Sequence, residues 1–460
     1  MQTMSSYFDS LLSQLGQKQI RENISSLGEK MSIEQESCLY PLSKNKSEYV
    51  KNCHLFDGTL KTIVDVSKLN MSLLMNATSF LEGKEYVLVA HDVCDIRKEH
   101  SKKLEGLGKV KSLDGKIING YQTYNSVALS FKNPSLRLLG CIPFSNGDAA
   151  YVTKAEEEGY QTGQLRKMVG TERYDEVVEH LSSGSAYNQK KIILEQIQSI
   201  TNHIRSVNSS AAIVSLYDRG FDDQAIFEQE EKMGNLFVIR GKLNRNSNEL
   251  YIDENGKEKA IKLVHQSFNK GEEICFKKVR IKNKTHTNVT GVFEWNLVDI
   301  NDHTYNVVRV RLYTATGKCV YKDPMILITN IEVNSLKMAH LVFEFYLQRA
   351  KIEGVFKFCK DIFKWEKPRM DDWLAMKNLL TFVYFIAGYF YEIEDQITED
   401  STCQWLAELG NGKGKVTKHF LLKGLQKIAH FQIMKRYFEQ HNQVNQDELS
   451  KQVNLLFFRE

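Results

Sequence analysis

The fold of this chain is decided by a short apolar run that ends in an acid, EYVLVAHD at residues 85–92. Aliphatic and β-branched residues without polar alternation are typical of a strand that is buried on both faces of a sheet. A second run of the same kind, AAIVSLYD at 211–218, also ends in an aspartate. Because the carboxyl ends of parallel strands meet at one edge of a sheet, the two runs predict a buried sheet that brings two acids together.

The segments around these runs predict a mixed α/β layer structure. Further strands are expected at 122–131, 135–144 and 235–242, and helices at 185–207 and 222–233. From about residue 241 to 320 the apolar residues alternate with a period near two, which predicts an inserted antiparallel β region. The α/β pattern resumes with MILITNI at 325–331, and both ends of the chain are expected to be helical.

The composition is typical of a soluble globular protein, since 42% of the 460 residues are apolar and 10% are aromatic. The eight cysteines form no C-x-x-C pair and the histidines form no H-E-x-x-H pattern, so we expect reduced thiols and no zinc site. The first residues lack the charge order of a signal peptide, and LLTFVYFIAGYF at 379–390 is too short to span a bilayer. We therefore expect a soluble intracellular protein that does not bind a membrane.

Asp92 and Asp218, the acids that end the two runs, are the first candidate site residues. Each can cap a turn or can contribute to a cation site, because magnesium prefers carboxylate ligands. A third acid would complete a two-metal arrangement for attack at phosphorus. Asp95 is a rival to Asp92, whereas Asp222 and Asp223 are weaker rivals to Asp218, since they fall at a helix start and suit capping.

A third acid stands in the stretch EFYLQRAKIEGVFKFCK at residues 344–360. At about 100° per residue, one helix over this stretch would place five polar side chains on one narrow face, namely Tyr346, Arg349, Glu353, Lys357 and Lys360. An ordinary amphipathic helix explains such a stripe, and Glu353 and Lys357 would then form an i,i+4 pair. A cleft that holds a metal ion beside a phosphate backbone explains it as well.

Three motifs resemble those of the DDE transposases of the bacterial insertion-sequence-four family. The Y-R-E-K signature of that family is matched at every spacing by Tyr346-x2-Arg349-x3-Glu353-x6-Lys360. DRGF at 218–221 resembles the second-aspartate motif, and HDVCDIRK at 91–98 resembles the first. The resemblance covers residues 80–370 and implies a ribonuclease-H-like core with a β-rich insertion ahead of the glutamate.

The resemblance implies that Asp92, Asp218 and Glu353 hold two magnesium or manganese ions, which would activate water and then a DNA 3′-hydroxyl. It also implies three DNA contacts at the transposon end, from Tyr346, Arg349 and Lys360. Ala350 departs from the family, which often has tryptophan there, so stacking on a flipped base would need another residue.

The expected organisation has five parts. They are a helical DNA-binding region (1–80), the first part of the ribonuclease-H-like core (81–240), the β-rich insertion (241–324), the second part of the core with the glutamate helix (325–395), and a basic helical region for DNA binding or dimerisation (396–460).

Two basic clusters are candidates for binding DNA phosphates. One strand and its turn include Lys277, Lys278 and Arg280. Residues 411–437 hold seven Lys or Arg and no acid, and include Lys413, Lys415 and Lys418. A solvated face is the alternative interpretation of each cluster.

The sequence thus predicts a cut-and-paste DNA transposase that acts as a homodimer on the paired inverted repeats of double-stranded DNA. Its location would be the bacterial cytoplasm, and the nucleoid when it is bound to DNA. The alternatives are a metal nuclease on the same fold without strand transfer, and a degenerate, non-catalytic DNA-binding protein.

Overall fold

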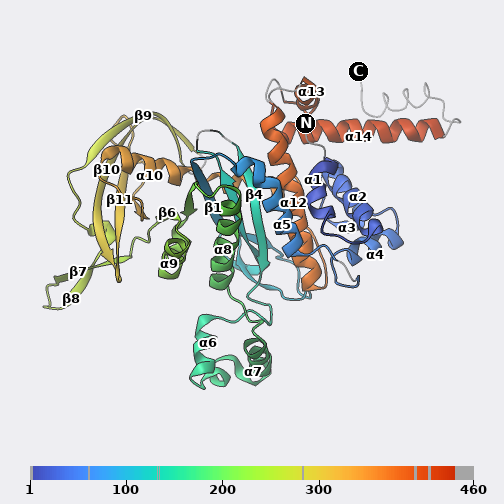
Figure 1. The fold of residues 1–460 in the computed structure, drawn as a ribbon. Coiled ribbons are helices and arrows are strands. Elements are labelled where there is room, and N and C mark those ends of the chain that lie inside the picture. The colour runs from blue at the N-terminus through green and yellow to red at the C-terminus, as the bar shows by residue number, and fades with distance from the viewer. Residues whose placement is uncertain are drawn as a thin grey trace.

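A computed structural model describes residues 4–60, 63–131, 133, 135–281, 284–397, 401–412 and 416–440. Its centre is a ten-stranded sheet in the order β2-β3-β1-β5-β6-β12-β11-β10-β9, with β4 paired to β3 (Figure 1). The strands are β1 (Tyr86–Arg97), β2 (Gly108–Lys111), β3 (Ile117–Leu129), β4 (Leu136–Phe144), β5 (Ala212–Tyr217), β6 (Leu236–Arg240), β9 (Glu272–Ile281), β10 (Lys284–Ile300), β11 (His303–Tyr313) and β12 (Met325–Thr329). The mixed α/β class expected from the sequence is confirmed, and the sheet is consistent with the ribonuclease-H-like core that the resemblance implies.

The two acid-ending runs form the neighbouring strands β1 and β5, which pair in parallel from Tyr86 opposite Ala212 to Ala90 opposite Leu216. β1 does not end at Asp92 as expected, because its second half goes on to pair with β3 as far as Arg97. The short strand β2, which pairs with the start of β3, was not predicted from the sequence.

The β-rich segment before residue 325 extends the central sheet. β10 and β11 form a long antiparallel pair, and β11 is hydrogen-bonded to β12, which in turn pairs with β6. A separate hairpin of β7 (Asn246–Ile252) and β8 (Glu258–Lys262) projects from this end of the molecule (Figure 1). β9, β10 and β11 therefore belong to the same sheet as the core strands.

Helices cover both faces of the sheet and make a three-layer structure. On one face, α5 (Val66–Leu81) and α8 (Gln189–Val207) pack on alternate residues of β1 and β5, including Val87, Val89 and Ile213, and α9 (Gln224–Lys232) packs beside them on β6. On the other face, α10 (Leu336–Gln348) lies across the strands from β5 to β9, and α11 (Lys351–Asp361) reaches β1.

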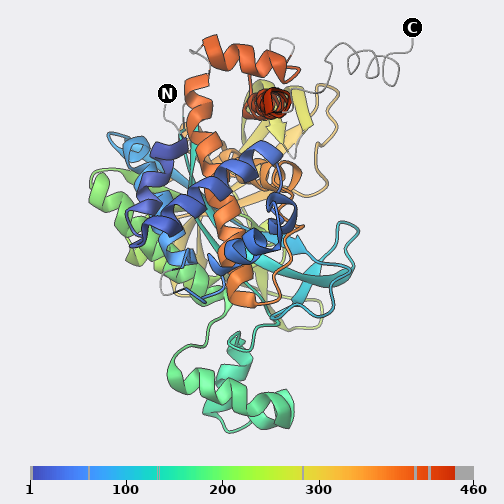
Figure 2. The same cartoon turned by 90° about the vertical axis from the view of Figure 1, so that its right-hand side faces the viewer.

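The most apolar helix, α12 (Trp373–Ile397), is a core element. It is longer than the stretch expected from the sequence, and within the described residues it is the one helix long and apolar enough to cross a membrane. However, 89% of its most apolar window is buried. α1 (Met4–Leu12) and α2 (Lys18–Glu34) lie over it, followed by α3 (Leu39–Leu42) and α4 (Lys46–His54) (Figure 2).

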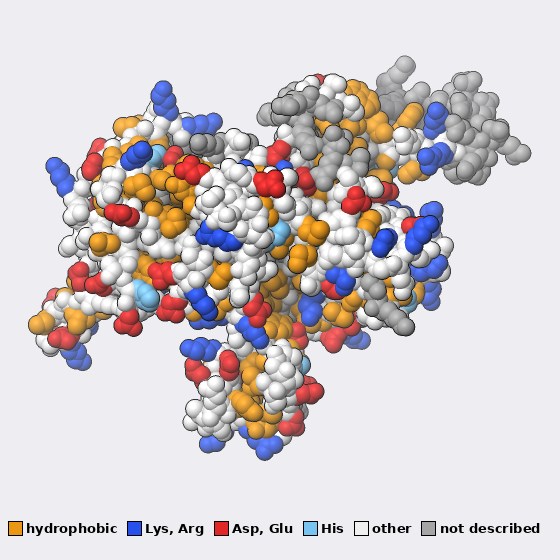
Figure 3. All heavy atoms as spheres, in the orientation of Figure 1, with side chains coloured by type: hydrophobic (Ala, Val, Ile, Leu, Met, Phe, Trp, Pro, Cys, Tyr) orange, Lys and Arg blue, Asp and Glu red, His pale blue; other side chains and the backbone are white. Residues whose placement is uncertain are grey.

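A small lobe of α6 (Lys154–Gln161) and α7 (Leu165–Ser183) projects away from the sheet in both ribbon views. The polar stretch that forms it carried no predicted element. The lobe has a small apolar cluster of its own around Val152, Leu165 and Val177, and Figure 3 shows apolar side chains along its middle. Its base is tied to the core by the Tyr187 hydroxyl and the Trp373 indole N–H, which both donate to Asp148.

The C-terminal part contains α13 (Ser401–Leu409) and α14 (Lys418–Gln440), and α14 extends beyond the body of the molecule (Figure 1). Helical structure was expected here. Lys413 and Lys415, two of the predicted DNA contacts, lie outside the described residues.

The packing of α1 on α12 predicts a large stability loss for Phe385→Ala. Phe385 is fully buried, and its ring lies 4.9 Å from that of Tyr7 and 5.2 Å from that of Phe8, measured between centroids. The cavity should lower the free energy of unfolding by about 3–5 kcal/mol in urea denaturation. Leu374→Ala, on the same helix but 40% exposed, should cost below about 1 kcal/mol. If both variants lost the same free energy of unfolding, the contact of Phe385 with α1 would not be a major source of stability.

Candidate active site

Asp92 and Asp218 are brought together by the register of β1 and β5. Ala90 is opposite Leu216, and each acid stands two residues further along its strand direction. Successive side chains of a strand alternate between the faces of a sheet, so each acid shares a face with the residue two before it. Leu88, Ala90, Val214 and Leu216 all belong to the core under α10 and α11, so both acids point toward those helices.

Glu353 comes from the helical segment that covers this face. The single helix expected over 344–360 is two helices, because the chain turns at Arg349 and Ala350 between α10 and α11. The Arg349 N–H donates to the Tyr346 carbonyl, and the Ile352 N–H donates to the Arg349 carbonyl, both at 3.1 Å. Glu353 thereby falls in the first turn of α11, where the helix dipole favours a negative charge.

One guanidinium joins two of the three acids. Arg349 Nη1 donates to Asp92 Oδ2 at 2.8 Å, and Nη2 donates to Glu353 Oε1 at 2.6 Å. The Arg349 residue is only 8% exposed, so its charge is balanced by these carboxylates more than by water. Burial alone would lower the pKa of Arg349, but the nearby Asp92, Tyr346, Asp218 and Glu353 raise it, so Arg349 stays cationic.

Tyr346 faces the remaining acid. Its hydroxyl donates to Asp218 Oδ1 at 3.3 Å. Burial, and then the charge of Asp218, raise the pKa of Tyr346 to about 12, so this hydroxyl remains a donor at neutral pH. Tyr346, Arg349, Glu353 and the two aspartates thus form one contiguous cluster.

The two aspartates differ in their electrostatics. Burial raises the pKa of Asp92 to about 6 and outweighs the attraction of Arg349 and the backbone N–H of Val93. Burial acts in the same direction on Asp218, but Arg349, the backbone N–H of Arg219, and Arg240 together hold the pKa of Asp218 below its usual value. Asp218 is therefore charged at neutral pH, whereas Asp92 gains its charge only near pH 6.

The donor chemistry of this cluster fits a hard divalent cation, since it offers carboxylate oxygens around a place that already attracts a positive group. Across the described ranges, no three His, Cys, Asp or Glu side chains are grouped closely enough to hold a metal ion. The guanidinium of Arg349 explains this, because it takes one oxygen each from Asp92 and Glu353. A metal ion held by these carboxylates would have to replace Arg349 as their positive partner.

The rival acids are engaged elsewhere. Asp95 lines the same hollow as Asp92 and Asp218, a cavity of about 480 Å³, but its carboxylate accepts from Gln122 instead of Arg349. Asp223 caps α9 as expected, by accepting from the Ala225 N–H. Asp222 does not cap the helix; its fully buried carboxylate accepts from the Lys242 N–H and pairs with Arg245.

The lysines of the predicted stripe divide into two kinds. Lys360 Nζ donates to the Asp95 carbonyl at 2.6 Å and lies 3.0 Å from Glu366, so it ties α11 to β1. Lys357 is exposed, and its expected partner Glu353 is bound to Arg349 instead. The expected pairing of Lys357 with Glu353 was therefore wrong, because Arg349 lies one turn earlier on the side facing Asp92.

The structure adds cations that the sequence did not single out. Arg240 ends β6 and acts on both Asp218 and Tyr346, while Lys109 and Lys111 of β2 line the hollow beside the acids. Arg240 has a sequence signal, because it ends the apolar run NLFVI just as the aspartates end theirs. The lysines of β2 had none, since that strand was not predicted.

The predicted DNA contacts outside the stripe lie on two elements. Lys277, Lys278 and Arg280 are all exposed on β9, and Figure 3 shows basic side chains gathered over this edge of the sheet. Lys418, at the start of α14, is less accessible. Its ammonium lies 2.6 Å from Glu394 and 3.9 Å from the centroid of the Tyr391 ring.

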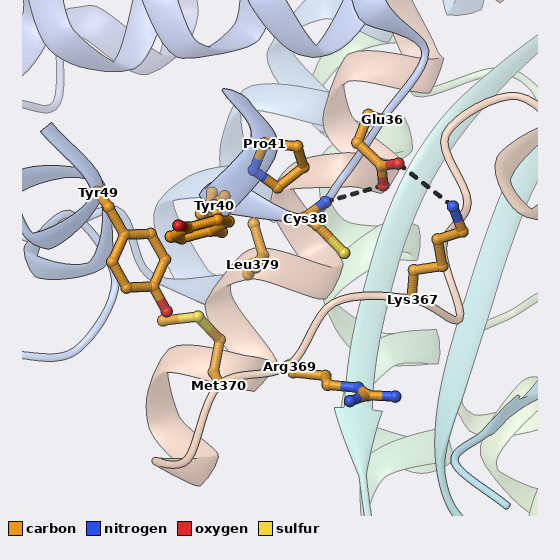
Figure 4. A pocket seen from close by; sticks show the side chains of 10 residues that line it. Glu36, Cys38, Tyr40, Pro41, Tyr49, Lys367, Arg369, Met370 and Leu379 are labelled. Carbon is orange, nitrogen blue, oxygen red and sulfur yellow. Dashed lines mark hydrogen bonds and ion pairs between the residues drawn. The ribbon is translucent and has the colours of Figure 1, made fainter. Parts of the chain in front are cut away.

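A further cavity of about 520 Å³ lies between α3, α4 and the segment before α12 (Figure 4). Among the described side chains that line it, Glu36 is the one acid, and Lys367 lies 3.4 Å from the Glu36 carboxylate. Tyr40, Tyr49 and Met370 form much of the remaining wall. One paired carboxylate does not suit two-metal chemistry, so the acid cluster is the better candidate for catalysis.

Arg349→Ala tests the internal ion pair. It leaves the Asp92 carboxylate buried without its counter-ion, which should lower the free energy of unfolding by about 3–5 kcal/mol at neutral pH in urea denaturation. The exposed Arg311→Ala should change it by less than about 0.5 kcal/mol. Adding Asp92→Asn to Arg349→Ala should restore part of the loss, and no restoration would contradict the pairing.

The raised pKa of Asp92 predicts a pH dependence of stability. In the unfolded chain this carboxyl ionises near about pH 4, whereas in the folded protein it keeps its proton to about pH 6. The contribution of Asp92 to stability is therefore present in acid, falls as pH rises between these values, and is flat above them. The unfolding free energy of the wild type minus that of Asp92→Asn should follow this curve, and a rise over that window would contradict it.

Comparison with known proteins bears on this geometry. Residues 193–388 match a family model described as the transposase DDE domain. The matched segment contains Asp218 and Glu353, while Asp92 precedes it. A search of curated proteins found no match. DDE transposases generally use divalent metal ions, and DNA is the partner that the family implies. The match over residues 193–388 supports a DDE transposase.

Proposed function

We propose that this chain is a cut-and-paste transposase of the insertion-sequence-four type, which cleaves DNA at transposon ends and joins the 3′-hydroxyl to target DNA. The observation that carries the proposal is the single guanidinium that binds Asp92 of β1 and Glu353 of α11 beside Asp218. Three acids from distant parts of the chain converge there on one sheet face. A structural ion pair would need only one of them.

In this proposal Asp92, Asp218 and Glu353 hold two divalent cations, Mg²⁺ or Mn²⁺. When bound, the cations would supply Lewis-acid activation of water and of the 3′-hydroxyl, and would neutralise charge on the phosphate. The chain's own residues set the conditions for this. The register of β1 and β5 aligns the aspartates, and the first turn of α11 presents Glu353 to them.

Arg349 has a second role in this proposal. Its two donors grip two carboxylates, and the same planar fork suits two oxygens of a phosphate. A DNA phosphate that enters the site competes with Asp92 and Glu353 for this group. Tyr346 and Lys360 complete the DNA-contacting set, with Tyr346 directed at Asp218 and Lys360 at the end of β1.

The remaining parts of the proposal concern assembly. Double-stranded DNA with terminal inverted repeats is the substrate, and two copies of the chain hold the paired ends. The helices of 1–80 and the basic region of 396–460 contribute to end binding or to dimer formation. The ranges 81–240 and 325–395 form the catalytic core around the insertion of 241–324.

One reaction separates transposition from simple nuclease activity. The protein is incubated with Mg²⁺, DNA carrying the inverted repeats that flank the reading frame, and a supercoiled target plasmid. Joined products on a gel are expected, because the 3′-hydroxyl released at the end is the nucleophile for the target. Nicks without joined products would favour the metal nuclease instead.

The site assignment predicts different effects for two neighbouring acids. Asp218→Ala should leave DNA binding unchanged and should lower end cleavage at least about 100-fold, since it removes a metal ligand. Asp95→Ala is the matched control, because Asp95 lines the same hollow without touching Arg349, and its cleavage should stay within about threefold of wild type. Cleavage by Asp218→Ala at the wild-type rate would refute the assignment.

A further inference from the structure

A second hollow lies on the other side of the α10–α11 junction. It is a groove of about 810 Å³ whose walls come from β9, from α10 and α11, and from the start of α14. Arg349 points from this junction to Asp92, whereas its neighbours Gln348 and Lys351 line the groove. The α10–α11 junction thus borders both the acid cluster and the groove.

The charge of the groove is positive. Its lining includes Lys278, Arg280, Lys351, Lys357 and Lys418, against the carboxylates of Glu344 and Glu394. Glu394 is neutralised by Lys418 at 2.6 Å, and Glu344 lies 3.8 Å from His340. The groove therefore presents more positive than negative charge to a ligand.

Three of these cations are available to a ligand. Lys278, Arg280 and Lys357 are exposed, and in the part of the chain that the structure describes no carboxylate lies within 4.0 Å of their charged nitrogens. Lys351 is partly committed, because its ammonium lies 3.4 Å from the Asn133 carbonyl and burial lowers its pKa. Lys418 belongs to the wall, since Glu394 and the Tyr391 ring hold its ammonium.

The three available cations come from two elements that face each other. Lys278 and Arg280 stand two residues apart on β9, so their side chains leave the same face of the strand. Lys357 stands one turn after Glu353 on α11. A polyanion that touches all three would lie along the groove and reach α11 one turn from Glu353.

We infer that this groove binds the phosphodiester backbone of DNA and guides it past α11 to the acid cluster. The inference deepens the proposed function and rests on it. It assigns Lys357, which has no role in the Y-R-E-K signature, to DNA binding. It also separates Lys278 and Arg280 from Lys277, which is exposed on the same strand but does not line the groove.

Two triple variants of the full chain test the inference. Lys278→Ala/Arg280→Ala/Lys357→Ala removes the available groove cations. Lys262→Ala/Lys270→Ala/Lys284→Ala removes the same charge from exposed lysines of the same β region that do not line the groove. Binding of each to a fluorescent duplex of about 30 base pairs is followed by anisotropy over a range of salt concentrations.

The groove variant should bind at least about tenfold more weakly near 0.1 M salt, and its plot of log affinity against log salt should be shallower by about 2 to 3. The control should keep the wild-type slope within about 1. All substituted side chains are exposed, so thermal unfolding should show both variants folded like the wild type.

Two results would overturn the inference in distinguishable ways. If the wild type binds and cleaves DNA and the two triple variants have equal slopes, the groove assignment fails while the transposase proposal stands. If the wild type neither binds the duplex nor cleaves end-bearing DNA, the proposed function fails and the groove assignment fails with it.

Discussion

The candidate site depends on the balance of charge around Arg349. A guanidinium that is removed from water loses several kcal/mol of hydration, and only close carboxylates with good geometry offset that loss. Asp92 and Glu353 supply them at 2.8 and 2.6 Å from two different elements. The ion pair therefore holds α11 against β1 and at the same time keeps two acids within reach of one cation. The same contacts balance the charge of the buried Asp92 and of Glu353, whose side chain is partly open to solvent.

The pairing register of β1 and β5 determines where the two aspartates of the cluster lie. β1 and β5 are parallel neighbours, and their pairing places Asp92 and Asp218 at equivalent positions on one face. The same face receives α10 and α11, so the third acid needs no long loop to reach them. A shift of one residue in either strand would turn its aspartate to the opposite face, toward α5 and α8. The buried pattern of Val87, Val89 and Ile213 on that face makes such a shift costly.

The extension of the sheet by β9, β10 and β11 links the face that carries the acid cluster to a basic edge. Because these strands continue the core sheet, α10 lies across both and holds β9 at a defined distance from α11. The cations of β9 and α11 can then act on one substrate, although Lys278 and Lys357 are far apart in the chain. The acid cluster and the basic groove share the α10–α11 junction, because Arg349 lies one residue from Gln348 and Ala350 of the groove wall.

The mixed α/β class of the fold was readable from the sequence, because buried strands leave a local pattern of apolar runs that does not depend on distant contacts. The three acids were proposed as a site from the sequence, and the structure places them close together. The spacing of Tyr346, Arg349, Glu353 and Lys360 was local in the same way. Three features could be found only from the tertiary structure. Arg349 pairs with both Asp92 and Glu353, Lys357 lines the groove, and Lys418 is bound to Glu394 in the groove wall. Helical spacing gives the direction of a side chain about its own helix, but the choice between several carboxylates depends on which strand lies opposite. The break at Arg349 and Ala350 and the continuation of β1 to Arg97 were missed for the same reason, since both come from packing against elements far away in the chain.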